Sequence, residues 1–220
     1  APMVGLRING REVMPNLLGL QSASLSFPQV FDQTDEGRTS DAEWLSLASL
    51  LPEPQGAAAF IDAGNHLVGL PSVLAAKGYQ SLSAVAFEPS FWNRRIMHPS
   101  FGFSRSYFEA DFGPGEVIGW GLNDRDFFLQ MVPRLTSAPG PFVAWLITES
   151  LHYPFETFPD LHKHLDVRPW NDTPFGNYIH GMHYFDLALG DFLAALERGG
   201  LLAHTVVVVT GDHSVGFPWN

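Results

Sequence analysis

The chain has 220 residues, a length that suits one large domain. Its net charge is -11, with only 12 Lys and Arg residues, which argues against a nucleic-acid partner because such a partner needs clustered basic side chains. It contains no cysteine, which excludes thiolate nucleophiles, thiolate metal sites and disulfides, and no apolar run of the roughly 18–20 residues that span a membrane. A phosphate-containing substrate is compatible with this acidic chain if a bound metal supplies the positive charge.

The first half of the chain predicts short elements separated by polar turns. In order these are a helix at 13–20, an extended segment at 25–31, a polar loop at 32–38, a helix at 41–51, a strand at 57–62, a helix at 70–76 and a strand at 82–87. Pro52 should end the helix at 41–51, because proline lacks the backbone N–H that a helix interior requires. Pro71 suits the first turn of the helix at 70–76, and Gly78 suits its C-cap.

The second half predicts longer elements: a helix at 124–135, a strand at 142–148, a helix at 178–196 and a strand at 205–210. The helix at 178–196 has one apolar stripe at helical spacing, and Gly199 and Gly200 should terminate it. The strand at 205–210 contains four consecutive valines, which is typical of a strand buried on both faces. Two segments, 88–121 and 153–176, have no regular pattern.

Alternating strands and helices predict an α/β fold with a mostly parallel central sheet and helices on both faces. We expect the strands at 57–62, 82–87, 142–148 and 205–210 to share that sheet. Ligands of such sheets bind beyond the carboxyl ends of the strands, where the loops converge.

Polar candidates follow three of the predicted strands. Trp92 and Arg94 come after the strand at 82–87, His152 after the strand at 142–148, and Asp212 with His213 after the strand at 205–210. A carboxylate beside an imidazole is half of a divalent-metal site. The alternative interpretation is that Asp212 caps a turn and His213 is a surface residue.

Three of these side chains have two interpretations each. The planar guanidinium of Arg94 matches phosphate oxygens, but it would also suit a surface ion pair. His152 could donate a proton to a transferred group or be a hydrogen-bonded loop residue. Trp92 is a residue type found in cores more often than in sites.

A hydroxyl pair lies where the helix at 41–51 should begin. Ser40 or Thr39 can act as the N-cap, and Ser40 with Glu43 fits a capping box. The same position favours negative charge, because a helix N-terminus presents unpaired N–H groups. It therefore also suits a reactive alkoxide and a bound phosphoryl group.

In this order, the motifs of the chain resemble the lipoteichoic acid synthase family, in the sulfatase-like branch of the alkaline phosphatase superfamily. The matching segments are Asn9–Val13, Pro15–Asn16, Asp32–Gln33, Gly37–Glu43, Ser90–Arg94, Gly102–Phe103, Trp120–Gly121, His152–Phe155, Tyr184–Asp186 and Gly211–His213. The resemblance covers nearly the whole chain. It implies an alkaline phosphatase/sulfatase-like fold in which residues 1–220 form a single partial catalytic domain, truncated at both ends.

The resemblance also implies roles for the candidate residues. Thr39 would be the nucleophile and a metal ligand, and Asp212 and His213 would be the other ligands. Trp92, Arg94 and His152 would contact the phosphoglycerol group. If one metal is to contact both Thr39 and Asp212, the hydroxyl should lie within about 5 Å of the carboxylate.

The implied activity is the transfer of glycerol phosphate from phosphatidylglycerol to a glycan or polymer acceptor, through a covalent threonine intermediate. The implied cofactor is a divalent metal, Mn²⁺ before Mg²⁺ or Zn²⁺. The partners would be a phospholipid headgroup, the acceptor and the cell membrane, through an N-terminal anchor, with the catalytic domain on the extracytoplasmic side.

The chain departs from the family pattern at three places. A metal-ligand Glu is expected just before Ala1, a His-Gly pair is replaced by Val85 and Ala86, and the family's C-terminal portion does not follow. We therefore expect this fragment to be inactive alone. The alternatives are a phosphoethanolamine transferase, a phosphodiesterase, a sulfatase-type hydrolase, or a non-catalytic binding domain. Thr39–Glu43 lacks the Pro and Arg of a sulfatase motif, which disfavours the sulfatase.

Overall fold

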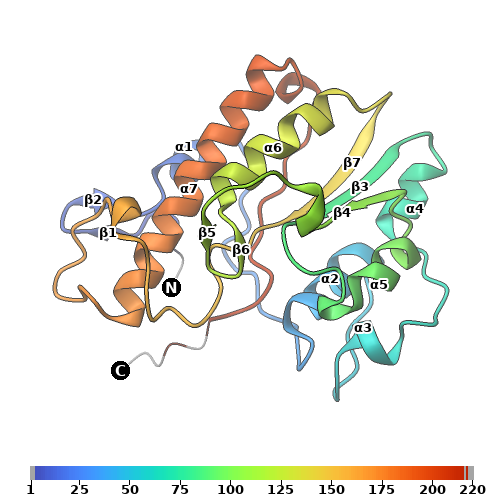
Figure 1. Ribbon diagram of the computed structural model, residues 1–220, viewed down its shortest axis with the longest axis horizontal. Coiled ribbons are helices and arrows are strands. Elements are labelled where there is room, and N and C mark those ends of the chain that lie inside the picture. Colours follow the sequence, from blue (N-terminus) through green and yellow to red (C-terminus); the bar gives the residue numbers. More distant parts are fainter. Residues whose placement is uncertain (1–2, 216, 218–220) are drawn as a thin grey trace. The chain divides into compact units, whose positions relative to one another are not determined.

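The computed structural model describes residues 3–215 and 217 (Figure 1). The chain divides into two compact units, each described by itself. Unit 1 comprises the described residues of Ala1–Val30, Gly113–Thr136 and Thr148–Thr205. Unit 2 comprises those of Phe31–Phe112, Ser137–Ile147 and Val206–Asn220. Among the described residues, no helix combines the length and the apolar character needed to cross a membrane.

Unit 2 is built on a three-stranded parallel sheet in the order β4-β3-β7. Its strands are β3 (Gln80–Val85), β4 (Arg105–Tyr107) and β7 (Phe142–Ile147). The central strand β3 is the most buried of the three, because it has a hydrogen-bonded neighbour on each side. The helices of the unit are α2 (Arg38–Ala48), α3 (Ala58–Ile61), α4 (Leu70–Ala75), α5 (Arg94–Phe101), η1 (Phe91–Asn93) and η2 (Glu109–Asp111).

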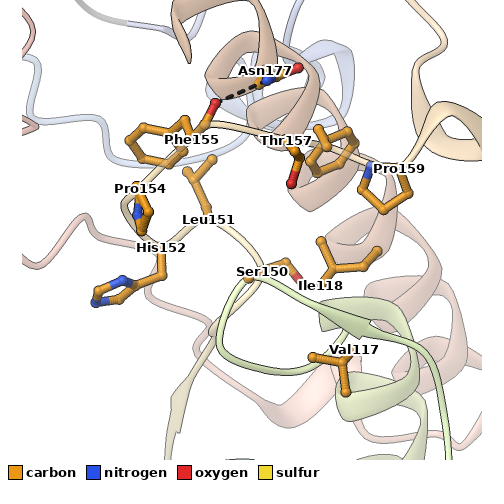
Figure 2. Close-up of a pocket in the computed structure, with 13 residues that line it drawn as sticks. Val117, Ile118, Ser150, Leu151, His152, Pro154, Phe155, Thr157, Pro159 and Asn177 are labelled. Atoms are coloured by element: carbon orange, nitrogen blue, oxygen red, sulfur yellow. Dashed lines mark hydrogen bonds between the residues drawn. The ribbon is translucent and has the colours of Figure 1, made fainter.

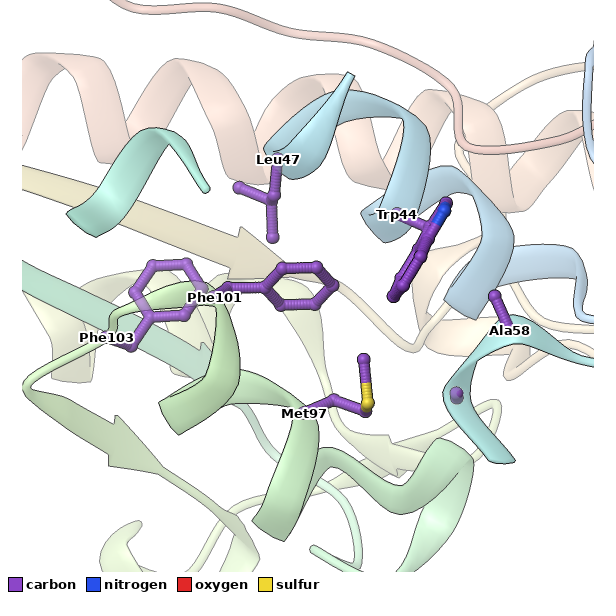
Figure 3. Packing of buried hydrophobic residues seen from close by; sticks show 7 residues of the cluster. Trp44, Leu47, Ala58, Met97, Phe101 and Phe103 are labelled. Carbon is purple, nitrogen blue, oxygen red and sulfur yellow. The ribbon is translucent and has the colours of Figure 1, made fainter. Parts of the chain in front are cut away.

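The core of unit 2 lies between α2 and α5. Figure 3 shows Trp44 and Leu47 of α2 directed toward Met97 and Phe101 of α5. Trp44 and Phe101 make an edge-to-face contact with their ring centroids 6.1 Å apart. Because apolar burial of this kind is the main stabilising term in folding, the two helices hold each other in place. The first turn of α2, which contains Thr39, is thereby fixed.

Unit 1 is mainly helical, with α7 (Pro174–Arg198) as its central element. Its other helices are α1 (Pro15–Gln21), α6 (Asp124–Thr136), η3 (Asp160–His162) and η4 (Leu202–His204). Two short hairpins complete it, formed by β1 (Arg7–Ile8) with β2 (Arg11–Glu12) and β5 (Val117–Ile118) with β6 (Gly121–Leu122). Phe128 of α6 stacks on Phe192 of α7 with centroids 4.7 Å apart.

The docking of α1 on α7 explains one of the sequence motifs. Asp186 of α7 is fully buried and accepts hydrogen bonds from the backbone N–H groups of Asn16 and Leu17, both at 2.8 Å. These N–H groups lie in the first turn of α1, where no intrahelical acceptor is available. Asp186 therefore completes the start of α1, which is a structural role.

Most of the predicted elements are confirmed, together with the α/β class and its parallel sheet. The helices at 13–20, 70–76, 124–135 and 178–196 are present, with ends shifted by a few residues. The strands at 82–87 and 142–148 are parallel neighbours. β4 was missed because three polar and aromatic residues give no hydrophobic run. The expected cover of the sheet by helices on both faces stays a prediction.

The strand predicted at 57–62 is wrong, since these residues form α3. Three consecutive alanines, 57–59, favour a helix, because alanine has the highest helix propensity. A short apolar run does not distinguish a strand from a buried helical turn.

The strand predicted at 205–210 is also wrong. Thr205 is extended, with φ -121° and ψ 128°, but within the described residues no strand pairs with this segment. Val206 and Val208 are 90% and 79% exposed, so the segment is not buried on both faces. β-branched residues favour extended backbone, but a strand also requires a neighbour that satisfies its N–H and C=O groups.

Candidate active site

Thr39 lies in the first turn of α2, and the start of that helix differs from the prediction. The N-cap is Gly37, not Thr39 or Ser40. Asp41 reaches back and accepts hydrogen bonds from the N–H groups of Asp35 and Gly37, both at 3.0 Å. This buried carboxylate thereby holds the N-cap residue and the turn before it against the helix, which begins three residues earlier than expected. A side chain at Gly37 would collide with Asp41, so this position requires glycine.

The predicted capping box of Ser40 and Glu43 is therefore wrong. The Ser40 hydroxyl donates to the carbonyl of Gly37 at 2.8 Å. Glu43 points into the interior, where it pairs with Arg94 and His98. The Thr39 side chain is half-buried and does not cap the helix.

Thr39, Asp212 and His213 come together in unit 2. The Thr39 hydroxyl donates a hydrogen bond to Asp212 Oδ2 at 2.8 Å. His213 Nε2 lies 3.6 Å from the same carboxylate oxygen. The His213 N–H donates to Asp212 Oδ1 at 2.9 Å, which fixes the carboxylate from its other side. The hydroxyl and the carboxylate are thus well within the expected 5 Å, and an imidazole nitrogen lies beside them.

A second contact holds the 212–214 segment against the residues that precede α2. Asp32 Oδ2 accepts hydrogen bonds from the N–H and the hydroxyl of Ser214, at 2.7 and 2.6 Å. Its Oδ1 accepts from the N–H and hydroxyl of Thr34. Burial alone would raise the pKa of Asp32, but the hydrogen bonds from Ser214 and Thr34 outweigh it and lower that pKa well below its usual range. Asp32 was not among the predicted site residues, although it lies in one of the matching motifs.

The donor chemistry of this group fits a divalent cation. A hydroxyl oxygen, a carboxylate oxygen and an imidazole nitrogen are ligand types that Mn²⁺, Mg²⁺ and Zn²⁺ accept. Asp212 and His213 contribute two ionisable ligands, and in the described part of the chain no group of three or more His, Asp or Glu side chains is arranged to hold a metal ion. The residues present therefore fit part of a coordination sphere.

Arg94 is not the surface residue that one interpretation predicted. It is 1% exposed, and its Nε donates to Glu43 Oε1 at 3.0 Å. Its Nη1 is buried and has no hydrogen-bond partner among the described residues. A buried donor without an acceptor is costly, so this nitrogen is suited to an incoming oxygen.

Trp92 is half-buried and has φ 50°, an uncommon conformation for a bulky residue. With Ser40, Glu43 and Met97 it lines a small cavity of about 10 Å³. Its ring lies 6.2 Å from that of Phe60, centroid to centroid. Trp92 therefore belongs partly to the core of unit 2, as the alternative interpretation predicted.

His152 belongs to unit 1, whereas the other predicted site residues belong to unit 2. Its ring stacks on Trp120 with centroids 3.5 Å apart, and its Nδ1 donates to the carbonyl of Tyr153 at 2.6 Å. The convergence of His152 with Thr39 stays a prediction.

A cavity of about 190 Å³ adjoins His152 within unit 1. Figure 2 shows its lining residues, with the His152 ring at one edge of the set. Asn177 of α7 donates two hydrogen bonds to the carbonyls of Phe155 and Glu156, at 2.9 and 3.1 Å. Asn177 thereby fixes the loop that follows His152.

The segment before His152 is fixed by a second buried pair. The Asp124 N–H donates to the Ser150 hydroxyl at 2.9 Å, and the Ser150 N–H donates to Asp124 Oδ1 at 3.0 Å. Burial raises the pKa of Asp124 from 3.8 to about 6, although the hydrogen bonds from Ser150 oppose this. Between pH 3.8 and about 6, the folded state therefore holds a proton on Asp124 that the unfolded state releases.

Asp124→Asn should make unfolding less dependent on pH. Because the folded pKa is raised, the stability that protonated Asp124 contributes is fully present below its unfolded pKa of 3.8 and is lost as pH rises through about 6. The unfolding free energy of the variant minus that of the wild type should therefore increase by about 3 kcal/mol from pH 3.5 to pH 7. Urea denaturation at several pH values measures this, and a difference that does not change with pH would contradict it.

Comparisons with known proteins identify the same family as the motifs do. The sulfatase family profile matches residues 1–217. The chain is 32% identical over 209 residues to the lipoteichoic acid synthase-like protein YvgJ of Bacillus subtilis (strain 168), covering 94% of this chain and 34% of that protein. It is 32% identical over 215 residues to lipoteichoic acid synthase 2 of the same organism, covering 96% of this chain and 33% of that protein.

Among solved structures, the lipoteichoic acid synthase LtaP from Listeria monocytogenes matches with a TM-score of 0.86 and 29% identity, covering 90% of this chain and 50% of that chain. The chain spans about a third of the length of the two curated relatives. The resemblance found from the motifs is confirmed.

Proposed function

The chain belongs to the sulfatase family and is similar to lipoteichoic acid synthases, and from this premise we propose that it is the catalytic region of a metal-dependent phosphoglycerol transferase. The observation that carries the proposal is the 2.8 Å hydrogen bond from the Thr39 hydroxyl to Asp212. This contact places a hydroxyl, which can act as a nucleophile, beside a carboxylate that can accept its proton. The hydroxyl lies in the N-terminal turn of a helix, a position that favours binding of phosphoryl groups.

The proposed first step is an attack by Thr39 Oγ1 on the phosphorus of phosphatidylglycerol. The bond between threonine oxygen and phosphorus forms, and the bond between phosphorus and the diacylglycerol oxygen breaks. The threonine proton passes to Asp212, which already accepts it as a hydrogen bond. Glycerol phosphate then remains esterified to Thr39, and the proton taken up by Asp212 completes the hydroxyl of diacylglycerol.

In the second step, an oxygen of an acceptor hydroxyl forms a bond to the same phosphorus, the bond between phosphorus and Thr39 Oγ1 breaks, and the proton of the acceptor hydroxyl passes to Thr39 Oγ1. Arg94, with its unpaired Nη1, is suited to neutralise charge on the phosphoryl oxygens during both steps. His152 is the candidate for a hydrogen bond to the phosphate or for proton transfer with the acceptor.

Thr39, Asp212 and His213 are the residues that would hold a divalent cation, with Mn²⁺ the first candidate. When bound, such an ion stabilises the ionised form of a hydroxyl and the charge of a phosphoryl group. Because the proposed donor is a membrane lipid, we propose that the protein acts at the membrane, with this region on the extracytoplasmic side. The acceptor would be a glycan or polymer hydroxyl.

The test uses full-length protein, Mn²⁺ and phosphatidylglycerol labelled in its headgroup. We expect release of diacylglycerol and label covalently bound to the protein. Phosphatidylethanolamine in a parallel reaction separates this activity from that of a phosphoethanolamine transferase. Release from phosphatidylethanolamine alone, or release of diacylglycerol without labelled protein, would contradict the proposal.

A further inference from the structure

Glu43 is a buried carboxylate that none of the proposed steps uses. It lies on α2 one helical turn after Thr39 and is 3% exposed. Its Oε1 accepts from Arg94 Nε at 3.0 Å, and its Oε2 accepts from His98 Nε2 at 2.8 Å. Both donors lie on α5, four residues apart, and therefore on one face of that helix.

The network continues from α5 into the sheet. His98 is fully buried, and its Nδ1 lies 2.8 Å from the Ser83 hydroxyl of β3. The Ser83 hydroxyl donates in turn to Ser106 of β4 at 2.7 Å. A single chain of polar contacts thus joins the helix of Thr39, the helix of Arg94 and two strands.

Stability alone is a weak explanation for this network. Taking charges out of water is costly, and well-packed apolar residues of similar volume often stabilise a fold at least as well as a buried ion pair. Burial alone would raise the pKa of Glu43, but the Arg94 charge and the His98 hydrogen bond outweigh it and lower that pKa. The carboxylate is therefore ionised and holds both donors in one geometry.

Among the described residues, Arg94 Nη1 is a buried donor of this network that has no hydrogen-bond partner. Glu43 binds the guanidinium through Nε and so fixes the plane in which Nη1 lies. Glu43 and Thr39 lie four residues apart on α2, so they occupy the same helix face. The carboxylate therefore sets the position of an unpaired cationic donor and of the helical turn that presents the hydroxyl.

We propose that Glu43 is a positioning residue for phosphoryl transfer, which holds the Arg94 guanidinium and the first turn of α2 so that Nη1 is presented to a non-bridging oxygen of a phosphodiester. This inference rests on the proposed function. In this role Glu43 acts on phosphoryl transfer through Arg94 and α2 and does not contact the substrate.

Glu43→Gln tests the proposal with little change in shape. Arg94 and His98 donate to different oxygens of Glu43, and glutamine replaces one of these oxygens with an NH2 group that cannot accept, so one of the two contacts is lost. We expect kcat/KM for phosphatidylglycerol to fall by about 100-fold, mainly through kcat, because small misplacement of a group that stabilises the transition state has effects of that size. Ser106→Ala, which removes the far end of the network, and Glu53→Gln, at an exposed glutamate, should each change kcat/KM less than about 3-fold.

Two further measurements separate positioning from a structural effect. In an Arg94→Gln background, Glu43→Gln should lower kcat/KM little further, since its effect acts through Arg94. Urea denaturation and circular dichroism establish that each variant is folded at the assay temperature. Equal kcat/KM for wild type and Glu43→Gln, or independent losses in the double variant, would overturn the proposal.

A binding measurement distinguishes this inference from the proposed function. Calorimetric titration with inorganic phosphate, at fixed Mn²⁺, should give at least about 10-fold weaker binding to Glu43→Gln than to wild type. If wild type binds phosphate more tightly than the variant but releases no diacylglycerol, the proposed function falls and the positioning role stands. Equal phosphate binding by both proteins would contradict the positioning role.

Discussion

Thr39→Ala should lower diacylglycerol release by at least about 10³-fold and eliminate label on the protein, because the variant has no oxygen to attack phosphorus. The fold should be retained. The only side-chain hydrogen bond described for Thr39 goes to Asp212, and the start of α2 depends on Gly37 and Asp41. Release is measured with labelled phosphatidylglycerol and Mn²⁺, and the protein is checked for label after denaturation.

Two variants control this experiment. Thr39→Ser keeps the hydroxyl and should retain activity within about 10-fold. Ser40→Ala should leave the covalent label in place, because the Ser40 hydroxyl is buried and donates to Gly37. If Thr39→Ala released diacylglycerol at the wild-type rate, the nucleophile assignment would be wrong, and the protein would be a hydrolase that uses water.

The periodic parts of the fold were predictable because their signal is local. The apolar stripe at 178–196 gave α7 in its correct place, and the runs at 82–87 and 142–148 gave two parallel neighbours. The strand at 205–210 was not predictable in the same way, because pairing depends on a partner elsewhere in the chain. Thr39 and Asp212 were identified as candidates from motifs, and the roles implied by the resemblance also predicted their approach, which the fold achieves across 173 positions of the chain.

The start of α2 shows where local reasoning fails. Ser40 and Glu43 fit a capping box by spacing, but the N-cap is Gly37, whose N–H donates to Asp41, and Glu43 binds residues 51 and 55 positions away. The local sequence does not distinguish a carboxylate that caps a helix from one that pairs with distant residues, because the pairing depends on which residues the fold brings near that carboxylate. The same is true of Asp32, whose partner Ser214 lies 182 positions away.

Asp212→Asn should weaken Mn²⁺ binding by at least about 100-fold and lower turnover to a similar extent. Asparagine keeps the shape and one acceptor oxygen, so the contact with Thr39 can persist, but the negative charge that attracts the cation is lost. The Asp212 side chain is about half exposed, so the change should have little effect on stability. Free Mn²⁺, measured by electron paramagnetic resonance during titration of the full-length protein, reports the affinity independently of activity.

His152→Ala is the matched comparison, because it removes a candidate site residue that is not a proposed metal ligand. It should slow transfer by about 10²–10³-fold, the usual contribution of a proton-transfer or phosphate-binding group, and leave Mn²⁺ affinity unchanged. The two variants therefore separate binding of the cation from handling of the phosphate. Unchanged Mn²⁺ affinity in Asp212→Asn would remove Asp212 from the metal site. Asp212 would then act on the Thr39 proton alone, through the hydrogen bond that joins them.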